Sequence, residues 1–216
     1  MRLRIKARIL NLFYPAKCVL CNKIIKAEHE EICPVCRLSL PKADMILRLG
    51  SYHEGVVSAL RYENEVRDAI IRYKFNGQFW LGEVFGALMA ETVAAKLSGR
   101  FDVITWTPVS LRRKLQRTYD QSELLANPIG RLLNVPVAQC LKKTKHTAAN
   151  SSLTDEKERR SNVAGVYEAL PGFENKRILL IDDVYTTGST LSECAKTLMR
   201  AGAESVVCAT LARAGE

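Results

Sequence analysis

The chain has 216 residues, of which 47% are hydrophobic and 25% are charged, and these fractions are typical of globular proteins rather than of disordered or fibrous ones. This length fits one main domain with a well-filled core and a small accessory module. The 32 basic residues outnumber the 23 acidic ones, and the resulting net charge of +9 favours anionic partners such as phosphorylated metabolites, nucleic acid or a lipid surface.

The first fourteen residues combine basic and apolar side chains. Arginine or lysine stands at positions 2, 4, 6 and 8, and the apolar segment at positions 9–13 is too broken for the core of a signal peptide. No apolar run in the chain approaches the roughly 18 residues that indicate a membrane span. We therefore predict a cytoplasmic protein. Residues 1–14 form either a helix packed on the next module, which the short apolar stripe favours, or a basic amphipathic helix at the inner face of the membrane.

The N-terminal part contains two Cys-x-x-Cys pairs separated by eleven residues: Cys18 with Cys21, and Cys33 with Cys36. Each pair forms a tight knuckle whose thiolates can point at one ion, and two knuckles complete a closed tetrahedral site. Disulfides are disfavoured in a reducing compartment, and a thioredoxin-like redox pair needs only one such motif. The sequence therefore predicts one structural Zn²⁺ in a module of residues 1–50, ahead of a main domain of residues 51–216.

The main domain begins with a short apolar element at residues 56–62. Apolar residues at helical spacing then predict helices over 66–73 and 81–93. The Asn-Gly pair at 76–77 is a turn signal that ends the first helix. Lys74, just before this turn, either contacts an anion or faces solvent, and its position alone favours solvent.

From residue 101 onward, predicted strands alternate with predicted helices. The strands are expected at residues 103–106, 135–141, 163–167, 178–181 and 205–211. Such alternation implies a parallel α/β sheet, in which ligands bind beyond the carboxyl ends of the strands. Pro128 interrupts the helix predicted over 121–133, which we expect to be kinked or to start late.

The loop after residue 106 carries four cations within six residues: Arg112, Arg113, Lys114 and Arg117. They form either a solvated patch or a site for a pyrophosphate that leaves the anomeric carbon of a sugar, and the planar guanidinium suits such a group. We favour the second interpretation, because this loop shares one edge of the sheet with a predicted phosphate site. The predicted pyrophosphate loop consists of Pro108, Val109, Ser110, Arg112 and Arg113, and Lys74 and Arg117 are further candidate anion contacts.

A polar tract at residues 142–162 has few apolar anchors. Loops of this length inside a compact domain are usually disordered segments or functional lids, and a basic lid would close over an anion. His146 within the tract is more simply interpreted as a solvated loop histidine than as a catalytic base.

The strand predicted at 178–181 leads into the segment on which the functional prediction depends. Its unbroken apolar run fits a strand buried on both faces, and Asp182 and Asp183 follow directly. The next residues supply hydroxyl groups, a glycine and a helix N-terminus, which together suit a phosphate monoester: Thr186, Thr187, Gly188, Ser189 and Thr190. The carboxylates would repel a phosphate, so they serve vicinal sugar hydroxyls or hydrated Mg²⁺. A phosphorylated sugar offers hydroxyl groups to the carboxylates and a phosphate to the residues that follow them.

These residues resemble a known family. The stretch 181–190 is similar to the phosphoribosyl pyrophosphate loop of type I phosphoribosyltransferases. The wider set of motifs resembles the ComF family over residues 18–213: the cysteine pairs, the 74–77 turn, the basic loop ending in Tyr119, Asp120 and Gln121, and Arg160 with Asn162, Val163 and Gly165. Ser110, Tyr119 and Asn150 depart from the family's usual residues. The resemblance implies an α/β fold with a type I phosphoribosyltransferase-like parallel sheet flanked by helices, after a small N-terminal zinc-binding module.

The resemblance also implies a role in bringing incoming single-stranded DNA into the cytoplasm during natural transformation, alongside a helicase-like ATPase and a DNA-processing protein. As an enzyme, the site would hold 5-phosphoribosyl-1-pyrophosphate with Mg²⁺, with Asp182 and Asp183 on the ribose hydroxyls and the arginines on the departing pyrophosphate. The acceptor is not specified by any visible segment. The alternative is a non-catalytic scaffold for the ATPase that binds a phosphoribosyl ligand or single-stranded DNA.

Overall fold

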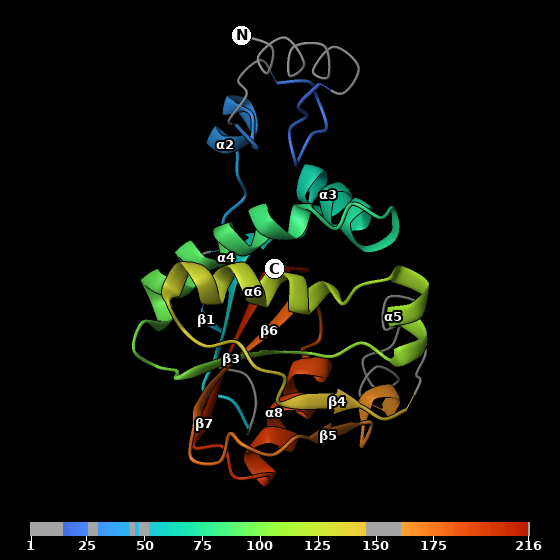
Figure 1. Cartoon of the computed structure of the whole chain (residues 1–216). Coiled ribbons are helices and arrows are strands. Elements are labelled where there is room, and N and C mark those ends of the chain that lie inside the picture. Colours follow the sequence, from blue (N-terminus) through green and yellow to red (C-terminus); the bar gives the residue numbers. More distant parts are fainter. Residues whose placement is uncertain (1–14, 26–29, 44–45, 48–51, 146–160, 216) are drawn as a thin grey trace, which may run out of the picture.

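The computed structural model describes residues 15–25, 30–43, 46–47, 52–145 and 161–215 (Figure 1). The helix predicted over residues 1–14, and His146 with most of the predicted lid, lie outside these ranges. The elements are, in chain order, α2 (Pro34–Leu38), β1 (Ile46–Leu47), β2 (Val56–Arg61), α3 (Asn64–Phe75), α4 (Leu81–Leu97), β3 (Val103–Trp106), α5 (Leu111–Arg117), α6 (Gln121–Leu133), β4 (Leu141–Lys143), β5 (Tyr167–Ala169), β6 (Arg177–Tyr185), α8 (Ser189–Arg200) and β7 (Ser205–Arg213).

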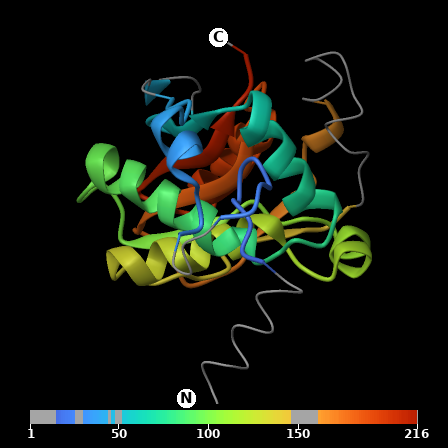
Figure 2. The same cartoon turned by 90° about the horizontal axis from the view of Figure 1, so that it is seen from above.

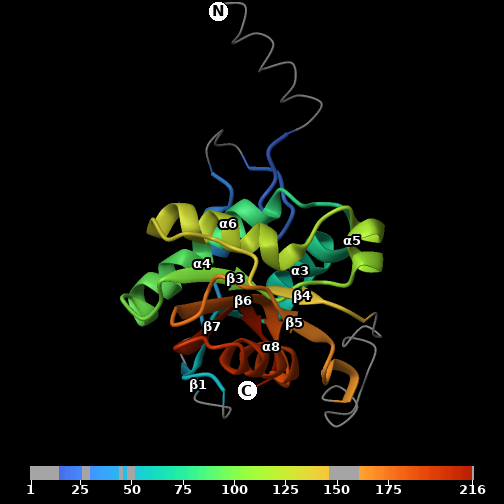
Figure 3. The same cartoon turned by 60° about the horizontal axis from the view of Figure 1, so that its bottom comes forward.

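The main sheet has the strand order β1-β2-β7-β6-β3, and every neighbouring pair is parallel except the short β1 with β2. The apolar run of β6, Ile178 to Ile181, is fully buried. Figure 3 shows the reason: α4 and α6 cover one face of the sheet and α8 covers the other. The predicted parallel α/β sheet, with a central strand buried on both faces, is therefore confirmed.

The helix predicted over 121–133 is confirmed as α6, and Pro128 lies inside it without ending it. The proline ring packs against α4 at Gly86, where a Cβ atom would stand 2.2 Å from Pro128 Cγ. A glycine on the facing helix thus makes room for the ring. The expectation that α6 would start late was wrong, because Asp120 caps its N-terminus with bonds from the amides of Ser122 and Glu123.

Two predicted strands are placed differently in the structure. Of residues 135–141, only Val137 bridges β3, because Pro136 has no N–H to extend the ladder and the chain then leaves the main sheet. The chain instead forms β4, which pairs antiparallel with β5 in a separate hairpin. The strand expected at 163–167 begins only at Tyr167. Conversely, the short apolar element at 56–62 is β2, a buried strand of the main sheet.

The cysteine module packs on the helical face of the main domain, where Figure 2 shows its blue trace over the green helices. Val19, Leu20 and Ile32 are buried in the same core cluster as residues of α3 and α4. Arg72 of α3 donates from Nη2 to the carbonyl oxygens of Val19 and Leu20, at 2.6 and 2.8 Å. No helix within the described ranges combines the length and apolar character needed to cross a bilayer.

Candidate functional site

A cavity of about 430 Å³ opens at the carboxyl ends of β6 and β3. It brings together eight of the residues predicted for the site: Lys74, Pro108, Val109, Arg113, Asp182, Asp183, Thr186 and Thr190. Eight further residues complete its lining: Tyr62, Arg67, Phe75, Thr107, Ser122, Lys143, Tyr167 and Val184. The parallel register explains this convergence, because Trp106 of β3 pairs with Ile181 of β6 and both chains leave the sheet at the same edge.

Other predicted site residues do not line the cavity. Arg112 is exposed on α5, and Ser110 is buried at the start of that helix. The segment predicted as a basic loop is helical from Leu111, since leucine, arginine, lysine and glutamine all favour helix. Neighbouring positions on a helix point about 100° apart, so Arg113 faces the cavity and Arg112 does not. The side chain of Arg117 lies outside the described part of the chain.

Asp182 is held from three directions. Its Oδ1 accepts hydrogen bonds from Thr107 Oγ1 at 2.7 Å, from Ser122 Oγ at 3.2 Å and from the amide of Asp183 at 2.9 Å. Burial, and then the nearby Asp183 carboxylate, raise the pKa of Asp182 to about 7, although the Thr107 hydroxyl favours the ionised form. The carboxyl group is thus fixed in orientation at the cavity wall.

Asp183 has a different environment. Its Oδ1 lies 2.8 Å from Lys74 Nζ, and the two side chains are only 16% and 20% exposed. Lys74 therefore faces the cavity and not solvent, contrary to the expectation from its position in the sequence. The pair places one neutralised carboxylate beside Asp182, whose negative charge has no such partner among the described residues.

The last turn of α3 connects this ion pair to the rest of the protein. Three consecutive residues contact three different parts: Arg72 binds the cysteine knuckle, Tyr73 donates to the carbonyl oxygen of Gln121 at 2.6 Å, and Lys74 pairs with Asp183. Tyr73 is fully buried against Phe85. The position of Lys74 is therefore set by packing on both sides of the helix.

The predicted phosphate loop joins β6 to α8. Gly188 has φ of +72° at the N-cap of α8, and a Cβ atom there would stand 2.8 Å from the Tyr185 ring, so only glycine fits without strain. Thr187 and Ser189 hydroxyls lie 3.0 Å apart. None of the residues in the first turn of α8 is acidic, which leaves the positive end of the helix dipole available to an anion.

Asp120 ties the segment before α5 to α6. Its Oδ2 accepts from the Val109 amide at 2.9 Å, while its Oδ1 accepts from the Ser122 amide at 3.1 Å. Burial raises the pKa of Asp120 to about 6, against these amide donors, which favour the carboxylate. One side chain thus fixes both the cap of α6 and the backbone at the cavity rim.

Seven polar or aromatic residues of the lining were not predicted from the sequence: Tyr62, Arg67, Phe75, Thr107, Ser122, Lys143 and Tyr167. Thr107 could have been found, because it directly follows a strand at the binding edge of the sheet. The other six follow β2 or come from α3, α6 and the β4–β5 hairpin, and no local motif marks them.

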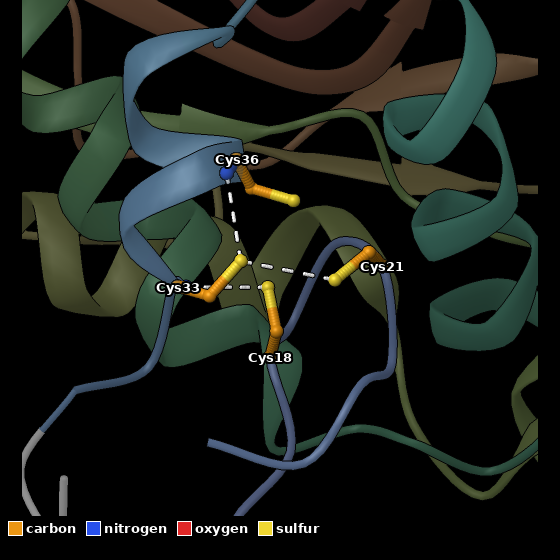
Figure 4. Close-up of side chains that lie close together, drawn as sticks. All are labelled: Cys18, Cys21, Cys33 and Cys36. Atoms are coloured by element: carbon orange, nitrogen blue, oxygen red, sulfur yellow. Dashed lines mark hydrogen bonds between the residues drawn. The ribbon is translucent and has the colours of Figure 1, made fainter. Parts of the chain in front are cut away.

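The four cysteines of the N-terminal module converge on one point, as Figure 4 shows. Their sulfur atoms all lie within 4.8 Å of one another, and those of Cys21 and Cys33 are 3.8 Å apart. Burial opposes ionisation of Cys18, but backbone N–H donors, first that of Cys33, outweigh it and lower its pKa to about 7. This closed set of four thiol ligands fits tetrahedral zinc and leaves no open position for catalysis.

Comparison with known proteins matches both parts of the chain. Residues 120–216 match the phosphoribosyl transferase domain, and residues 9–46 match the double zinc ribbon domain. Competence protein F of Haemophilus influenzae is 31% identical over 196 residues, covering 87% of this chain and 80% of the relative. Competence protein ComFC of Streptococcus pneumoniae is 32% identical over 209 residues, covering 91% and 87%. DNA utilization protein YhgH of Escherichia coli K12 is 26% identical over 227 residues, covering 93% and 100%. With a phosphoribosyl transferase domain behind a zinc ribbon and this similarity along nearly its whole length, the chain belongs to the ComF family.

Proposed function

We propose that the cavity binds 5-phosphoribosyl-1-pyrophosphate with Mg²⁺ and that the protein transfers the phosphoribosyl group to an acceptor during DNA uptake. The observation that carries this proposal is the presence of two anchors in one cavity: the Asp182 and Asp183 carboxylates, and Thr186 and Thr190 from the loop and first turn of α8. These suit the hydroxyls and the 5-phosphate of one ligand. The names of the relatives, which refer to competence and DNA utilization, supply the cellular context.

In this mechanism the bond between the anomeric carbon and pyrophosphate breaks, and a bond from the same carbon to the acceptor forms. Asp182 and Asp183 orient the ribose, residues Thr186 to Thr190 hold the 5-phosphate, and Arg113 compensates charge on the departing pyrophosphate. Mg²⁺, when bound with the donor, would neutralise phosphate charge, and carboxylate oxygens are among its preferred ligands. The carbon bears positive charge in the transition state, so positioning and electrostatics supply most of the rate.

Binding of the donor should stabilise the folded protein. At one hundred times the dissociation constant, linkage gives about 2.7 kcal/mol, which thermal melting detects easily. The measurement is melting with and without donor and Mg²⁺, followed by pyrophosphate release with nucleobases, ammonia or single-stranded DNA ends as acceptors. Release with one acceptor would name the reaction. Stabilisation without release would favour a ligand-binding scaffold, and no stabilisation of folded, zinc-loaded protein at millimolar donor would contradict the proposal.

A non-catalytic scaffold is the second candidate, and exposed apolar side chains favour it. Val35 and Leu38 on α2 are 74% and 90% exposed, which suits docking of the competence helicase-like ATPase or the DNA-processing protein. Phe79 and Trp80 are 55% and 58% exposed, and the Phe79 ring lies 6.0 Å from the ring of Tyr119, at a tilt of 57°. Tyr119 follows the cationic α5. Aromatic rings beside cations suit single-stranded DNA. Such partners, with the basic N-terminal segment, would be compatible with a peripheral position at the inner face of the membrane.

Direct binding of single-stranded DNA would depend steeply on salt, because neutralised phosphates release counterions. Replacing Arg112 and Lys114 by alanine should weaken binding of an oligonucleotide and reduce the slope of log affinity against log salt by about 1 to 2. Fluorescence anisotropy at several salt concentrations measures both quantities. If the affinity for the oligonucleotide does not change with salt, or is the same in the double variant as in wild type, direct binding of single-stranded DNA through these residues would be contradicted.

A further inference from the structure

The first cysteine knuckle contacts the main domain through the two residues between its cysteines. Val19 and Leu20 are buried in the same core cluster as residues of α3 and α4. The backbone closes this turn on itself, because the Asn22 amide donates to the carbonyl oxygen of Cys18 at 2.9 Å. A metal ion held by Cys18 and Cys21 would clamp the turn from both sides. The directions of the Val19 and Leu20 carbonyl groups therefore depend on the metal site.

One arginine of α3 binds both carbonyl groups. Arg72 Nη2 donates to the oxygen of Val19 at 2.6 Å and to that of Leu20 at 2.8 Å. Arg72 is half-buried, its Nε is buried without a hydrogen-bond partner among the described residues, and none of the described carboxylates is paired with it. Because removing a cation from water without acceptors costs free energy, the placement of this guanidinium depends on the folded knuckle.

The last turn of α3 is fixed on its other side by Tyr73. This side chain is fully buried, and its hydroxyl donates to the carbonyl oxygen of Gln121 in α6 at 2.6 Å. The carbonyl oxygen of Tyr73 accepts from the Tyr119 hydroxyl at 2.5 Å. Consecutive side chains on a helix point about 100° apart, so Arg72, Tyr73 and Lys74 address three different parts of the protein. A shift of Arg72 therefore either breaks the contacts of Tyr73 or moves Lys74.

Lys74 is the point at which this turn meets the cavity. Its Nζ lies 2.8 Å from Asp183 Oδ1, and the two side chains are mostly buried. An ion pair taken out of water is favourable only when its geometry is well fixed, so this pair is sensitive to the position of the helix. When the pair is intact, Asp183 is neutralised, and when it is broken, the carboxylate repels an anionic ligand.

We propose that Arg72 is a positioning residue that couples the zinc site to the cavity: the zinc-bound knuckle holds Arg72, and the last turn of α3 then holds Lys74 on Asp183 in the arrangement that binds an anionic phosphosugar. The turn is ordered before the ligand arrives, and loss of zinc or of Arg72 adds the ordering cost to the binding step. Coupling between two sites is reciprocal, so the bound phosphosugar also strengthens zinc binding. The effect on the phosphosugar rests on the proposed function, whereas the ordering of α3 does not.

Hydrogen exchange of the ligand-free, zinc-loaded protein tests the ordering of α3. Arg72→Met keeps the apolar stem and removes both hydrogen bonds, so the amides of residues 72–77 should exchange about 10-fold faster than in wild type. Removal of zinc from wild type should produce the same increase, with no further increase when zinc is removed from Arg72→Met. Arg72→Lys keeps a donor for the carbonyl groups and should restore most of the protection.

The matched control is Arg131→Met, which removes an arginine of α6 whose partner, Glu83, is exposed. Exchange of residues 72–77 in this variant should equal that of wild type. Wild-type exchange rates in Arg72→Met, or an equally large effect of zinc removal in Arg72→Met and in wild type, would overturn the coupling.

Titration with 5-phosphoribosyl-1-pyrophosphate and Mg²⁺ tests the consequence for the cavity. Arg72→Met should weaken the donor about 5- to 50-fold in zinc-loaded protein. In the Lys74→Met background the same substitution should change the affinity less than about twofold, because Arg72 acts through Lys74. The donor should also slow the transfer of zinc from wild type to a chromogenic chelator, and should not do so in Arg72→Met.

Equal loss of donor affinity in both backgrounds would show that Arg72 does not act through Lys74. Zinc transfer from wild type at the same rate with and without bound donor would equally contradict the coupling of the two sites. Wild-type protein that binds no donor overturns the proposed function, and the exchange comparison then decides the link between Arg72 and the zinc site by itself.

Discussion

Serine in place of Cys33 is expected to release the zinc and to destabilise the N-terminal module. The Cys33 thiol has two roles: its sulfur belongs to the four-sulfur cluster, and it accepts from the Cys36 amide as the N-cap of α2. Serine is a good N-cap residue, so the substitution preserves the cap and removes the thiolate ligand. Structural zinc contributes roughly 10 to 16 kcal/mol of apparent binding free energy, so release of the ion should remove most of the free energy that stabilises the module. Metal analysis and thermal melting measure the two effects.

The matched control for this variant is Cys140→Ser. Cys140 is a buried cysteine in the main domain, outside the cluster, so its substitution can change stability but should leave one zinc per chain. Chelation of zinc from the wild-type protein should reproduce the lower melting temperature of Cys33→Ser. An unchanged metal content in Cys33→Ser would contradict the assignment of this cysteine as a ligand.

Asparagine in place of Asp182 is expected to stabilise the ligand-free protein and to weaken donor binding, two effects of opposite sign. All three hydrogen bonds to Asp182 end on Oδ1, and an asparagine oxygen can accept them. The substitution therefore removes the charge and keeps the contacts. Donor affinity should fall about 10- to 100-fold, the effect of losing a hydrogen bond to a charged group. Titration with the donor measures the loss of affinity, and thermal melting without the donor measures the gain in stability.

The pH dependence of the stability distinguishes removal of the Asp182 charge from nonspecific destabilisation of the variant. The pKa of Asp182 is raised by burial to about 7, so its favourable contribution is complete below the ordinary value of 3.8 and is lost as the pH rises through about 7. The advantage of Asp182→Asn over wild type should grow across this window, to on the order of 4 kcal/mol.

Asp102→Asn is the matched control for the Asp182 variant. Arg177 lowers the pKa of Asp102 from its ordinary value of 3.8 to about 2. The variant should therefore lose stability relative to wild type as the pH rises from about 2 to 3.8. Asp102 lies beside the start of β6, at the opposite edge of the sheet from the cavity, and donor binding should not change. If Asp182→Asn bound the donor as tightly as wild type, Asp182 would not contact the ribose.

The amino-acid sequence by itself determined those features whose residues are close together in the chain. The two cysteine pairs need only a knuckle geometry of four residues each, and the structure brings all four sulfurs together. The buried strand, the acidic pair and the glycine at positive φ follow one another within residues 177–190, so one local pattern predicted the strand, the turn and the start of the helix. The boundary between residues 50 and 51 stays a prediction.

Only the tertiary structure decided which side chains face the cavity. Lys74 reaches Asp183, and Ser122 and Thr107 reach Asp182, through packing of helices on a sheet whose strands are distant in sequence. Arg113 and not Arg112 lines the cavity, because α5 is a helix and its rotation selects one of two adjacent arginines. Lys143 and not Lys142 does so because the hairpin pairs in one register and strand side chains alternate. Local sequence carries no information on these choices, since burial against other elements sets the helix rotation and the strand register.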